Sequence, residues 1–355
     1  QLKAGYAEAH YYRAQARLAL GDFAGGWADY DYRWLWKGFP HQRPRCSQPE
    51  WTGDDLNGRA LLVHHEQGLG DTIQFARYLS VVAARGGKVL FACPKELQSL
   101  FSATFGLFNI VNPNQPILKF DVHAPLMSLP RLCGTRLDTI PNQVPYLPLP
   151  PAERFPLPPS TRGRLRVGIV WAGDDRHPKD KLRSLSLTQF IPLLRNAACE
   201  FFSLQTPPRH AELASLPEGI HIEELGSRLR DFAETAAVLG QLDLIISADT
   251  AALHLAGALA RPAWGLLPFA PDWRWLLERE DSPWYPTLRL FRQSAAGDWS
   301  GVIARVQQEL DRAARRHQES GASPIPDHFP SGGAGGEPAV PAENVIYLSA
   351  PPATI

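Results

Sequence analysis

Cysteine is scarce in this chain of 355 residues, and its few copies are scattered. The cysteines lie at four well-separated positions, Cys46, Cys93, Cys133 and Cys199. They form no close pair, which fits neither a disulfide framework nor a zinc site. The pattern favours a protein of the reducing cytoplasm.

The chain also lacks an excess of charge and a long apolar run. Lysine plus arginine number 36 and aspartate plus glutamate number 36, so no net charge draws the molecule to nucleic acid or to an anionic membrane. No stretch approaches the roughly 18 consecutive apolar residues of a membrane span. We therefore predict a cytoplasmic protein with no nucleic-acid partner and no membrane span.

Residues 1–37 have the periodicity of two amphipathic helices. Ala14 and Leu18 recur at helical spacing, a Gly-Asp pair at 21–22 interrupts the pattern, and Trp27 resumes it. The segment resembles one tetratricopeptide (TPR) repeat, which needs a neighbour to bury its faces and commonly presents a protein-binding groove. A plain helical hairpin that caps the next domain is the alternative. Because the chain opens at Gln1, we expect it to be the end of a longer polypeptide.

Residues 38–316 alternate strands and helices in two blocks, which predicts an α/β protein with two doubly wound, Rossmann-like domains. The first domain is assigned to 38–140 and the second to 164–316. Prolines crowd 141–163, which predicts an interdomain linker, and the tail 317–355 is too poor in apolar residues to fold. Strands are expected at 60–64, 88–92, 108–111, 120–123, 164–171, 200–204, 221–225, 243–247 and 263–267. Helices are expected at 71–85, 187–196, 230–240, 249–260 and 298–315.

A glycine turn closes the first predicted strand and opens a helix. Gly68 and Gly70 permit close approach of the backbone, and Asp71 stands at the predicted helix start. In an open α/β domain this position faces the ligand cleft. The plain alternative is that Asp71 caps the helix by accepting the amide of Ile73 or Gln74. The turn lacks the full GxGxxG pattern, so no dinucleotide cofactor is expected.

Asp249, Thr250 and His254 follow the strand predicted at 243–247, where a helix opens. A helix start offers free amides and a positive dipole end to a phosphate, and Thr250 adds a hydroxyl. Asp249 would repel a phosphate, so we expect it to cap the helix or to accept from sugar hydroxyls. His254 lies on an alanine-rich face, where a satisfied core histidine is an equal alternative.

A charged loop, 174–187, lies between a predicted strand and a predicted helix. Lys179, Lys181 and Arg183 are candidates to neutralise a leaving diphosphate, and Ser184 is a candidate to bond one of its oxygens. The alternative is an ordinary solvated loop. The aromatic segment 271–286 is interpreted as either the rim of the cleft or core packing.

Taken in order, several segments resemble bacterial TPR proteins whose C-terminal region is similar to glycosyltransferase family 9, the ADP-heptose:lipopolysaccharide heptosyltransferases. They are GLGDTIQFARYL, FDVHAPLMSLP, VGIVWAG, RSLSL, DLIISADTAALHLAGAL and PDWRWLLEREDSPWYPTLRLFRQ. The resemblance implies a GT-B fold, in which two doubly wound domains face each other across a cleft. It also implies an inverting, metal-independent transferase whose donor is a nucleotide-diphospho-sugar, with ADP as one candidate nucleotide, and which needs no cofactor.

The same resemblance implies roles for individual residues. Asp71 matches the general base that deprotonates the acceptor hydroxyl. The nucleotide-sugar site is then assigned to Gly70, Lys181, Arg183, Ser184, Asp249, Thr250 and His254. The acceptor is a protein or a glycan, including a lipid-linked one, and the TPR-like helices favour a protein partner. Ala251 stands where heptosyltransferases often have glycine, which leaves substrate identity open.

Two other functions remain in view. A non-catalytic scaffold would bind a partner through its repeats and carry a transferase-like region that no longer turns over. A nucleotide-sugar epimerase would act without an acceptor. Nucleotide binding by the basic loop would count against the scaffold, and the order of the motifs favours transfer over epimerisation.

Overall fold

The computed structural model describes residues 6–102, 108–113, 119–160 and 163–320. It begins with a hairpin of α1 (Ala7–Ala19) and α2 (Phe23–Tyr30), extended by the 3₁₀ segment η1 (Asp31–Leu35). Gly21 makes the turn at φ +82°, a left-handed conformation that glycine adopts without strain. The Asp22 side chain then caps α2 by accepting the amide of Gly25 at 3.0 Å. The helical pair is present where predicted, and its membership of the TPR class stays a prediction.

The first sheet has four parallel strands in the order β3-β2-β1-β4. Helices and 3₁₀ turns connect them. The strands are β1 (Ala60–His64), β2 (Lys88–Ala92), β3 (Asn109–Val111) and β4 (Val122–Pro125). The helical elements are α3 (Leu69–Phe75), α4 (Arg77–Ala83), α5 (Lys95–Phe101), η2 (Leu126–Ser128), α6 (Leu129–Leu132) and η3 (Leu137–Thr139).

The second sheet has six parallel strands in the order β10-β9-β8-β5-β6-β7. The proline-rich segment before it carries only the short η4 (Ala152–Arg154) among its described residues. The strands are β5 (Leu165–Val170), β6 (Cys199–Ser203), β7 (Glu223–Glu224), β8 (Leu244–Ala248), β9 (Ala263–Leu267) and β10 (Leu288–Arg292). The helical elements are α7 (Asp180–Arg183), α8 (Leu187–Leu194), η5 (Arg209–Ser215), α9 (Phe232–Leu239), α10 (Ala251–Ala258), η6 (Trp273–Trp275) and α11 (Trp299–Ser320).

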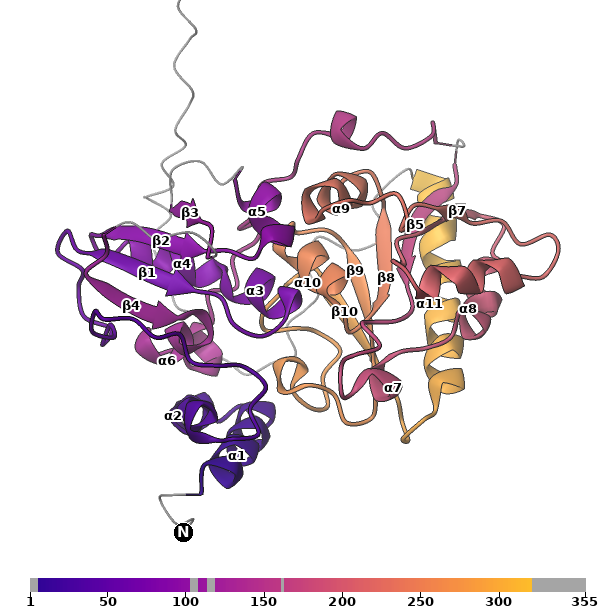
Figure 1. Ribbon diagram of the computed structural model, residues 1–355. Coiled ribbons are helices and arrows are strands. Elements are labelled where there is room, and N and C mark those ends of the chain that lie inside the picture. Colours follow the sequence, from indigo (N-terminus) through magenta and orange to yellow (C-terminus); the bar gives the residue numbers. More distant parts are fainter. Residues whose placement is uncertain (1–5, 103–107, 114–118, 161–162, 321–355) are drawn as a thin grey trace, which may run out of the picture.

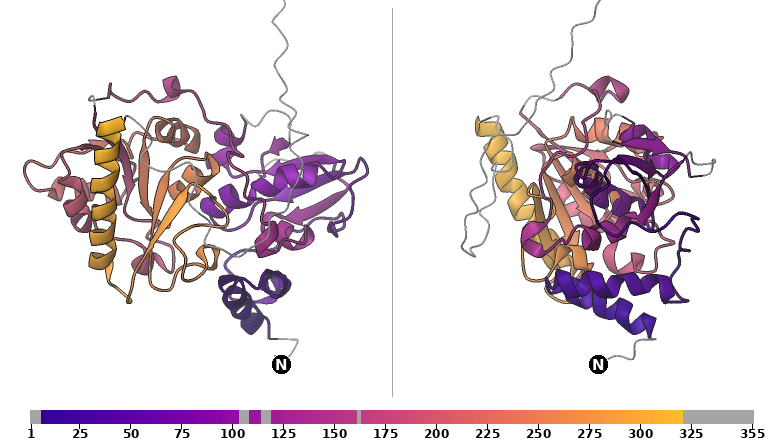
Figure 2. Two further views of the ribbon diagram at one scale, coloured as in Figure 1. Left: turned by 180° about the vertical axis from the view of Figure 1, so that it is seen from behind. Right: turned by 90° about the vertical axis from the view of Figure 1, so that its left-hand side faces the viewer.

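Helices cover both faces of the second sheet, as its nearly continuous apolar strands require (Figure 1). One core contains α8 and α11, and Figure 2 shows α11 lying along one face of the sheet. The other core contains α9 and α10 and continues without interruption into the first sheet and the hairpin. The two sheets are therefore joined by apolar packing and not by the connecting segment alone.

A cluster of aromatic side chains packs the α1–α2 hairpin against both α/β domains. Trp27 meets Trp273 edge-on, with ring centroids 5.3 Å apart. Phe23 stacks on Trp284 at 5.9 Å, and Phe75 of α3 meets the same indole at 5.7 Å. Such aromatic pairs add to the stabilisation from buried area. The hairpin thus buries its inner face on the α/β region, one of the two outcomes expected for an isolated helical pair.

A buried ion pair ties η1 to the first sheet. Arg33 is fully buried and donates from Nε to Oε2 of Glu66 at 2.9 Å and from Nη2 to Oε1 at 2.8 Å. Glu66 follows β1, and its Oε1 also accepts the amide of Met127, just after β4, at 3.0 Å. From β1 the chain adds β2 and β3 on one side and then returns to add β4 on the other. The strand order therefore reverses between β1 and β4. Arg33 occupies the crevice in which such sheets usually hold ligands.

The strands predicted at 60–64, 88–92 and 263–267 are confirmed to the residue, and most of the others lie within two residues of their predicted bounds. The strand β10 was not predicted. Its Leu288 and Leu290 are buried, but Arg289 and Arg292 break the apolar run expected of a covered strand, and an edge position tolerates them. The prediction of a strand over 221–225 was too long, because β7 is an edge of two residues paired to β6 alone.

Two helix predictions were also wrong in detail. The helix expected at 71–85 begins at Leu69 and is divided into α3 and α4 at Ala76. Helix α11 continues to Ser320, so the first residues of the predicted disordered tail are helical. The rest of that prediction, 321–355, lies outside the described residues.

Candidate active site

The reversal of strand order in the second sheet lies between β5 and β8. From β5 the chain first builds outward through β6 and β7 and then returns to build β8, β9 and β10 on the other side. Doubly wound sheets bind ligands outside the carboxyl ends of the strands at this point. Gly173 follows β5 there and Asp249 follows β8.

Arg183 lies across this crevice. It ends the short helix α7, and its Nη1 donates to the backbone carbonyl of Asp249 at 3.0 Å. Its guanidinium also lies over Gly173, where an added Cβ would come within 2.6 Å of Nη2. The predicted basic side chain is therefore at the ligand-binding end of the sheet. Lys181, two residues earlier, is exposed.

Ser184 has a structural role in this loop. Its Oγ accepts the amide of Gly173 at 3.0 Å and donates to Oδ1 of Asp180 at 2.5 Å. A hydroxyl has a single proton to donate. Ser184 donates this proton to Asp180, so the side chain stabilises the loop and offers no donor to a phosphate in this conformation.

Thr250 is the N-cap of α10, and its side chain makes no capping hydrogen bond. The Thr250 hydroxyl contacts Oγ of Ser247 at 3.0 Å. The expectation that Asp249 caps the helix is therefore wrong. The Thr250 side chain also accepts none of the first amides of α10. Free amides at the positive end of an eight-residue helix are suited to an anion.

Asp249 and His254 are both buried beside the start of α10. Burial raises the pKa of Asp249 to about 6, and Asp272 adds to the effect. Burial likewise lowers the pKa of His254 to about 3, so the imidazole is neutral at physiological pH. Nδ1 of His254 contacts the Tyr285 hydroxyl at 3.0 Å, and the ring stacks on Trp275 at 5.2 Å. In this structure His254 is a satisfied core histidine, with Nε2 3.9 Å from Oδ1 of Asp249.

The raised pKa of Asp249 gives a pH-dependent prediction. Between about pH 4, where an unfolded aspartate titrates, and about pH 6, the folded state binds more protons, so the free energy of unfolding falls as pH rises. Asp249→Asn removes the titrating carboxyl, so the variant does not lose this part of the free energy of unfolding as pH rises. We expect the variant to gain roughly 2 to 3 kcal/mol relative to the parent between about pH 4 and about pH 7.5, measured by urea unfolding. A difference that does not change with pH would contradict the assignment.

Asp71 lies in the first turn of α3 at position N3. Its Oδ2 accepts the amide of Gly68 at 2.8 Å, which closes the first turn from within. The alternative in which Asp71 accepts from Ile73 or Gln74 is therefore wrong, because the helix starts earlier than predicted. Its Oδ1 pairs with Nη2 of Arg274, and 20% of the side chain stays exposed. A substrate hydroxyl can reach a carboxylate in this state.

Arg274 is the functional candidate that sequence reasoning missed. It lies in η6, and its Nη2 pairs with Asp71. Its Nη1 donates to Oδ1 of Asp272 at 2.7 Å, and its Nε donates to Oε1 of Gln74 at 2.7 Å. Burial lowers its pKa, but Asp272 and Asp71 outweigh burial and the net shift is upward. The only signal in the sequence was an arginine between two tryptophans in PDWRW, a segment interpreted as rim or packing.

Gly70 brings the two predicted motifs together. A Cβ at this position would lie 2.9 Å from Cδ2 of His254 and 3.4 Å from Cα of Ala251. Helix α3 therefore packs directly on the beginning of α10, as Figure 1 shows at the junction of the two sheets. The structure places Asp71 on one side of this contact and Thr250 on the other.

Gly70→Ala should push α3 and α10 apart, because the ring of His254 is held by Trp275 and Tyr285 and has little room to move. We expect a loss of about 1 to 3 kcal/mol in the free energy of unfolding, as for other overpacked contacts. A double-mutant cycle with His254→Ala tests the cause. If the clash with His254 is responsible, Gly70→Ala will cost little in the His254→Ala background; an undiminished cost would refute it.

Two cavities lie away from this junction, one of about 150 Å³ beside β4 and one of about 810 Å³ beside β6 and β7. Within the described ranges, no group of three or more His, Cys, Asp or Glu side chains is arranged to hold a metal ion. No helix in the same ranges is long and apolar enough to cross a membrane.

No protein-family model matches the chain. Among curated proteins, Protein FlbA of Caulobacter vibrioides is 29% identical over 327 residues, which are 84% of this chain and 54% of FlbA. This chain thus spans about half the length of the curated relative that it matches. The name of that relative states no activity.

Two solved structures have the same architecture. The ADP-heptose LPS heptosyltransferase II of E. coli superposes with a TM-score of 0.51 at 13% identity, covering 74% of this chain and 100% of its own. A glycosyltransferase of family 9 from Veillonella parvula superposes with a TM-score of 0.51 at 11% identity, covering 77% of this chain and 99% of its own. The architecture of the present chain, two parallel α/β sheets meeting at α3 and α10, is the GT-B fold found in family 9 glycosyltransferases.

Proposed function

We propose that this chain is an inverting glycosyltransferase that moves a sugar from a nucleotide-diphospho-sugar to an acceptor hydroxyl, with Asp71 as the general base. The observation that carries the proposal is the contact of Gly70 with His254 and Ala251, which brings the start of α3 beside the start of α10. A base and an anion site that meet at one junction are what such a transfer requires. The fold shared with family 9 glycosyltransferases supports the same function.

The leaving diphosphate is assigned to the crevice between β5 and β8. The free amides of α10, the Thr250 hydroxyl and the guanidinium of Arg183 converge there, with Lys181 at the exposed edge. Fixed dipoles and cations stabilise charge that develops in the transition state. The proposal therefore assigns this role to side chains and a helix terminus, without a metal ion. ADP is the first nucleotide to test, because one structure with the same fold is an ADP-heptose enzyme.

The acceptor is proposed to be a protein or a glycan that approaches from the first sheet. Asp71, with 20% of its side chain exposed, then takes the proton of the attacking hydroxyl. Arg274 holds the carboxylate by a contact to Oδ1, while the Gly68 amide holds Oδ2. Two fixed contacts of this kind orient a base toward its substrate.

Calorimetric titration with ADP, UDP and GDP tests the donor site. Arg183→Ala should weaken binding of the preferred nucleotide by about tenfold to a hundredfold, the usual effect of losing a charge-assisted contact. Arg176→Ala is the matched control, because Arg176 belongs to the same loop but is 87% exposed and pairs only with Asp174 among the described residues. Equal weakening in both variants would point to general electrostatics and count against the assigned site.

A non-catalytic scaffold is the second candidate. One observation favours it: the proton of Ser184 is committed to Asp180, so this side chain offers no donor to a phosphate. A folded protein that binds none of the three nucleotides would support the scaffold. Nucleotide binding without transfer to any acceptor, together with an Asp71→Asn variant that behaves like the parent, would support it as well.

A further inference from the structure

The α1–α2 hairpin contacts the turn that leads into Asp71. Tyr30, the last residue of α2, is 2% exposed, and its hydroxyl accepts from Nε2 of Gln67 at 2.9 Å. Gln67 immediately precedes Gly68, whose amide donates to Oδ2 of Asp71. The hydroxyl of Tyr30 is therefore joined to the candidate base through one side chain and one backbone amide.

The backbone of Gln67 has a conformation that needs support. Its φ is +63°, in the left-handed region that residues other than glycine seldom adopt, and such a residue stays there only where its surroundings fix it. The contact with Tyr30 holds the Gln67 side chain. The preceding residue, Glu66, accepts two hydrogen bonds from Arg33 of η1. The hairpin and its extension η1 therefore fix the backbone that aims the Gly68 amide.

The hairpin also reaches the second support of Asp71. Trp27 and Tyr30 pack on Trp273, with ring centroids 5.3 Å and 6.3 Å away. The guanidinium of Arg274 lies over the ring of Trp273, 4.3 Å from its centroid, and pairs with Oδ1 of Asp71. Two routes thus run from the hairpin to the same carboxylate, one to each oxygen.

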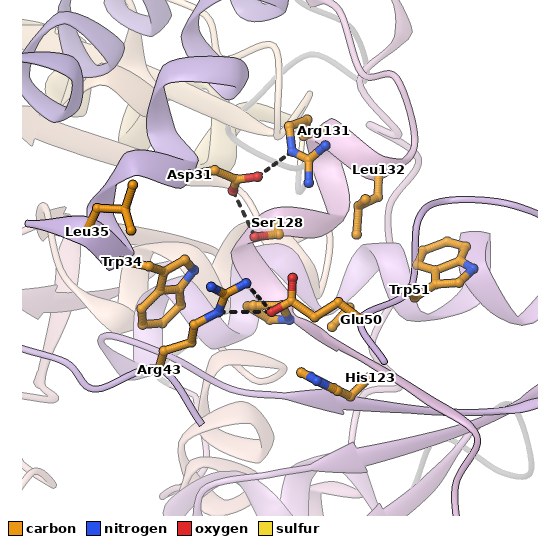
Figure 3. A pocket seen from close by; sticks show the side chains of 12 residues that line it. Asp31, Trp34, Leu35, Arg43, Glu50, Trp51, His123, Ser128, Arg131 and Leu132 are labelled. Carbon is orange, nitrogen blue, oxygen red and sulfur yellow. Dashed lines mark hydrogen bonds and ion pairs between the residues drawn. The ribbon is translucent and has the colours of Figure 1, made fainter. Parts of the chain in front are cut away.

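The end of the hairpin is itself anchored on the first sheet. The carboxylate of Asp31 pairs with Nε of Arg131 at 2.5 Å and accepts from Oγ of Ser128 at 3.0 Å (Figure 3). Arg33 donates to the same Asp31 carboxylate at 3.0 Å and to Oγ of Ser128 at 2.9 Å. Tyr30 directly precedes this anchored segment, so its hydroxyl has a defined place relative to β1 and β4.

We propose that the α1–α2 hairpin is a positioning element of the active site, in which Tyr30 and Gln67 set the orientation of the Asp71 carboxylate. Its catalytic meaning rests on the proposed function, since Asp71 acts as a base only if the chain transfers sugar. A displacement of about 1 Å can lower a rate about a hundredfold, so an element outside the cleft can control the chemistry. A hairpin that only covered apolar surface would need the rings of Trp27 and Tyr30 but not the Tyr30 hydroxyl.

Tyr30→Phe tests the proposal, because it removes the hydroxyl and keeps the ring that packs on Trp273. The exchange rate of the Gly68 amide should rise about threefold to tenfold, the effect of losing one neutral hydrogen bond. The measurement is hydrogen exchange by NMR on the whole chain with glycine-selective ¹⁵N labelling, with the Gly68 signal identified by Gly68→Ala. In steady-state assays kcat should fall about tenfold to a hundredfold, while the acceptor KM and the nucleotide affinity stay unchanged.

Gln67→Met breaks the same hydrogen bond from the other side and should have the same two effects. Combined with Tyr30→Phe it should add little, because both changes remove one interaction. Tyr32→Phe is the matched control, because Tyr32 belongs to η1 but its ring stacks on His10 within the hairpin, at 3.9 Å. This control should leave Gly68 exchange and kcat unchanged, and thermal melts establish that every variant is folded.

The two readouts separate this proposal from the proposed function. Faster Gly68 exchange in both variants supports the positioning of Asp71 even where the parent transfers no sugar, and in that case the proposed function alone fails. Unchanged Gly68 exchange in Tyr30→Phe or in Gln67→Met overturns the positioning, whatever the activity. A parent that transfers sugar with a kcat that neither substitution lowers, or losses that add in the double variant, would overturn it as well.

Discussion

Asp71→Asn should reduce sugar transfer by about 10² to 10⁴, the usual contribution of a general base, and leave nucleotide binding unchanged. The amide oxygen of asparagine can still accept from the Gly68 amide or from Arg274, so the first turn of α3 keeps its shape. It cannot accept a proton from the acceptor hydroxyl. The measurement is the rate of nucleotide release with donor and acceptor present, alongside calorimetric titration of the nucleotide.

Asp121→Asn is the control for this experiment. Asp121 belongs to the same sheet but lies at the opposite end of β1, where its Oδ2 accepts the amide of Ala60 at 2.7 Å. This variant should keep full transfer activity. If Asp71→Asn also keeps full activity, Asp71 is not the base, and its contacts with Gly68 and Arg274 are then structural.

Glu66→Gln should cost about 1 to 3 kcal/mol in the free energy of unfolding, because the buried guanidinium of Arg33 loses the charge of Glu66 and keeps only that of Asp31, which lies 3.0 Å from Nη1. Glutamine preserves the size of the side chain, so the loss reports on charge more than on packing. Arg33 is fully buried, and 2% of the Glu66 side chain is exposed. The measurement is urea unfolding, and the hairpin should be the first part to detach, since Arg33 ties η1 to the ends of β1 and β4.

Asp138→Asn supplies the comparison for the buried pair. Asp138 pairs with Arg136 on the surface, where the two side chains are 73% and 62% exposed. Exposed pairs contribute about 0 to 1 kcal/mol, so this variant should be close to the parent. A similar small loss for Glu66→Gln would mean that Asp31 alone is enough to balance the charge of Arg33.

The two halves of the candidate site were predictable to different degrees. Asp249, Thr250 and Arg183 lie at one crevice, because strand-to-helix junctions of a parallel sheet all meet at the same edge, and their role there stays a prediction. The contacts of Asp71 were not predicted. Its partner Arg274 is 203 positions away in the chain, and no local pattern connects the two. Ser184 donates its hydroxyl proton to Asp180, four positions earlier in the chain, so it offers no donor to a phosphate in this conformation.

Local pattern was sufficient for the elements and for the class of fold. Apolar runs of five residues bounded by glycine or proline predict covered strands, and their alternation with amphipathic helices predicts parallel sheets. Residues 60–64 and 263–267 illustrate this, because each strand is apolar along nearly all of its length and needs cover on both faces. Such preferences depend on neighbours in the chain, so they can be read from the sequence.

Long-range packing decided the rest. The hairpin docks through Trp27 on Trp273 and through Arg33 on Glu66, and Gly70 sets the approach of α3 to α10. Each of these contacts joins separate segments of the chain, and each depends on shape, burial and charge that exist only after the sheets concerned have formed. The same is true of the cavity beside β4, whose walls come from three separate segments. The sequence specifies these contacts physically, but only the folded chain brings their partners within reach.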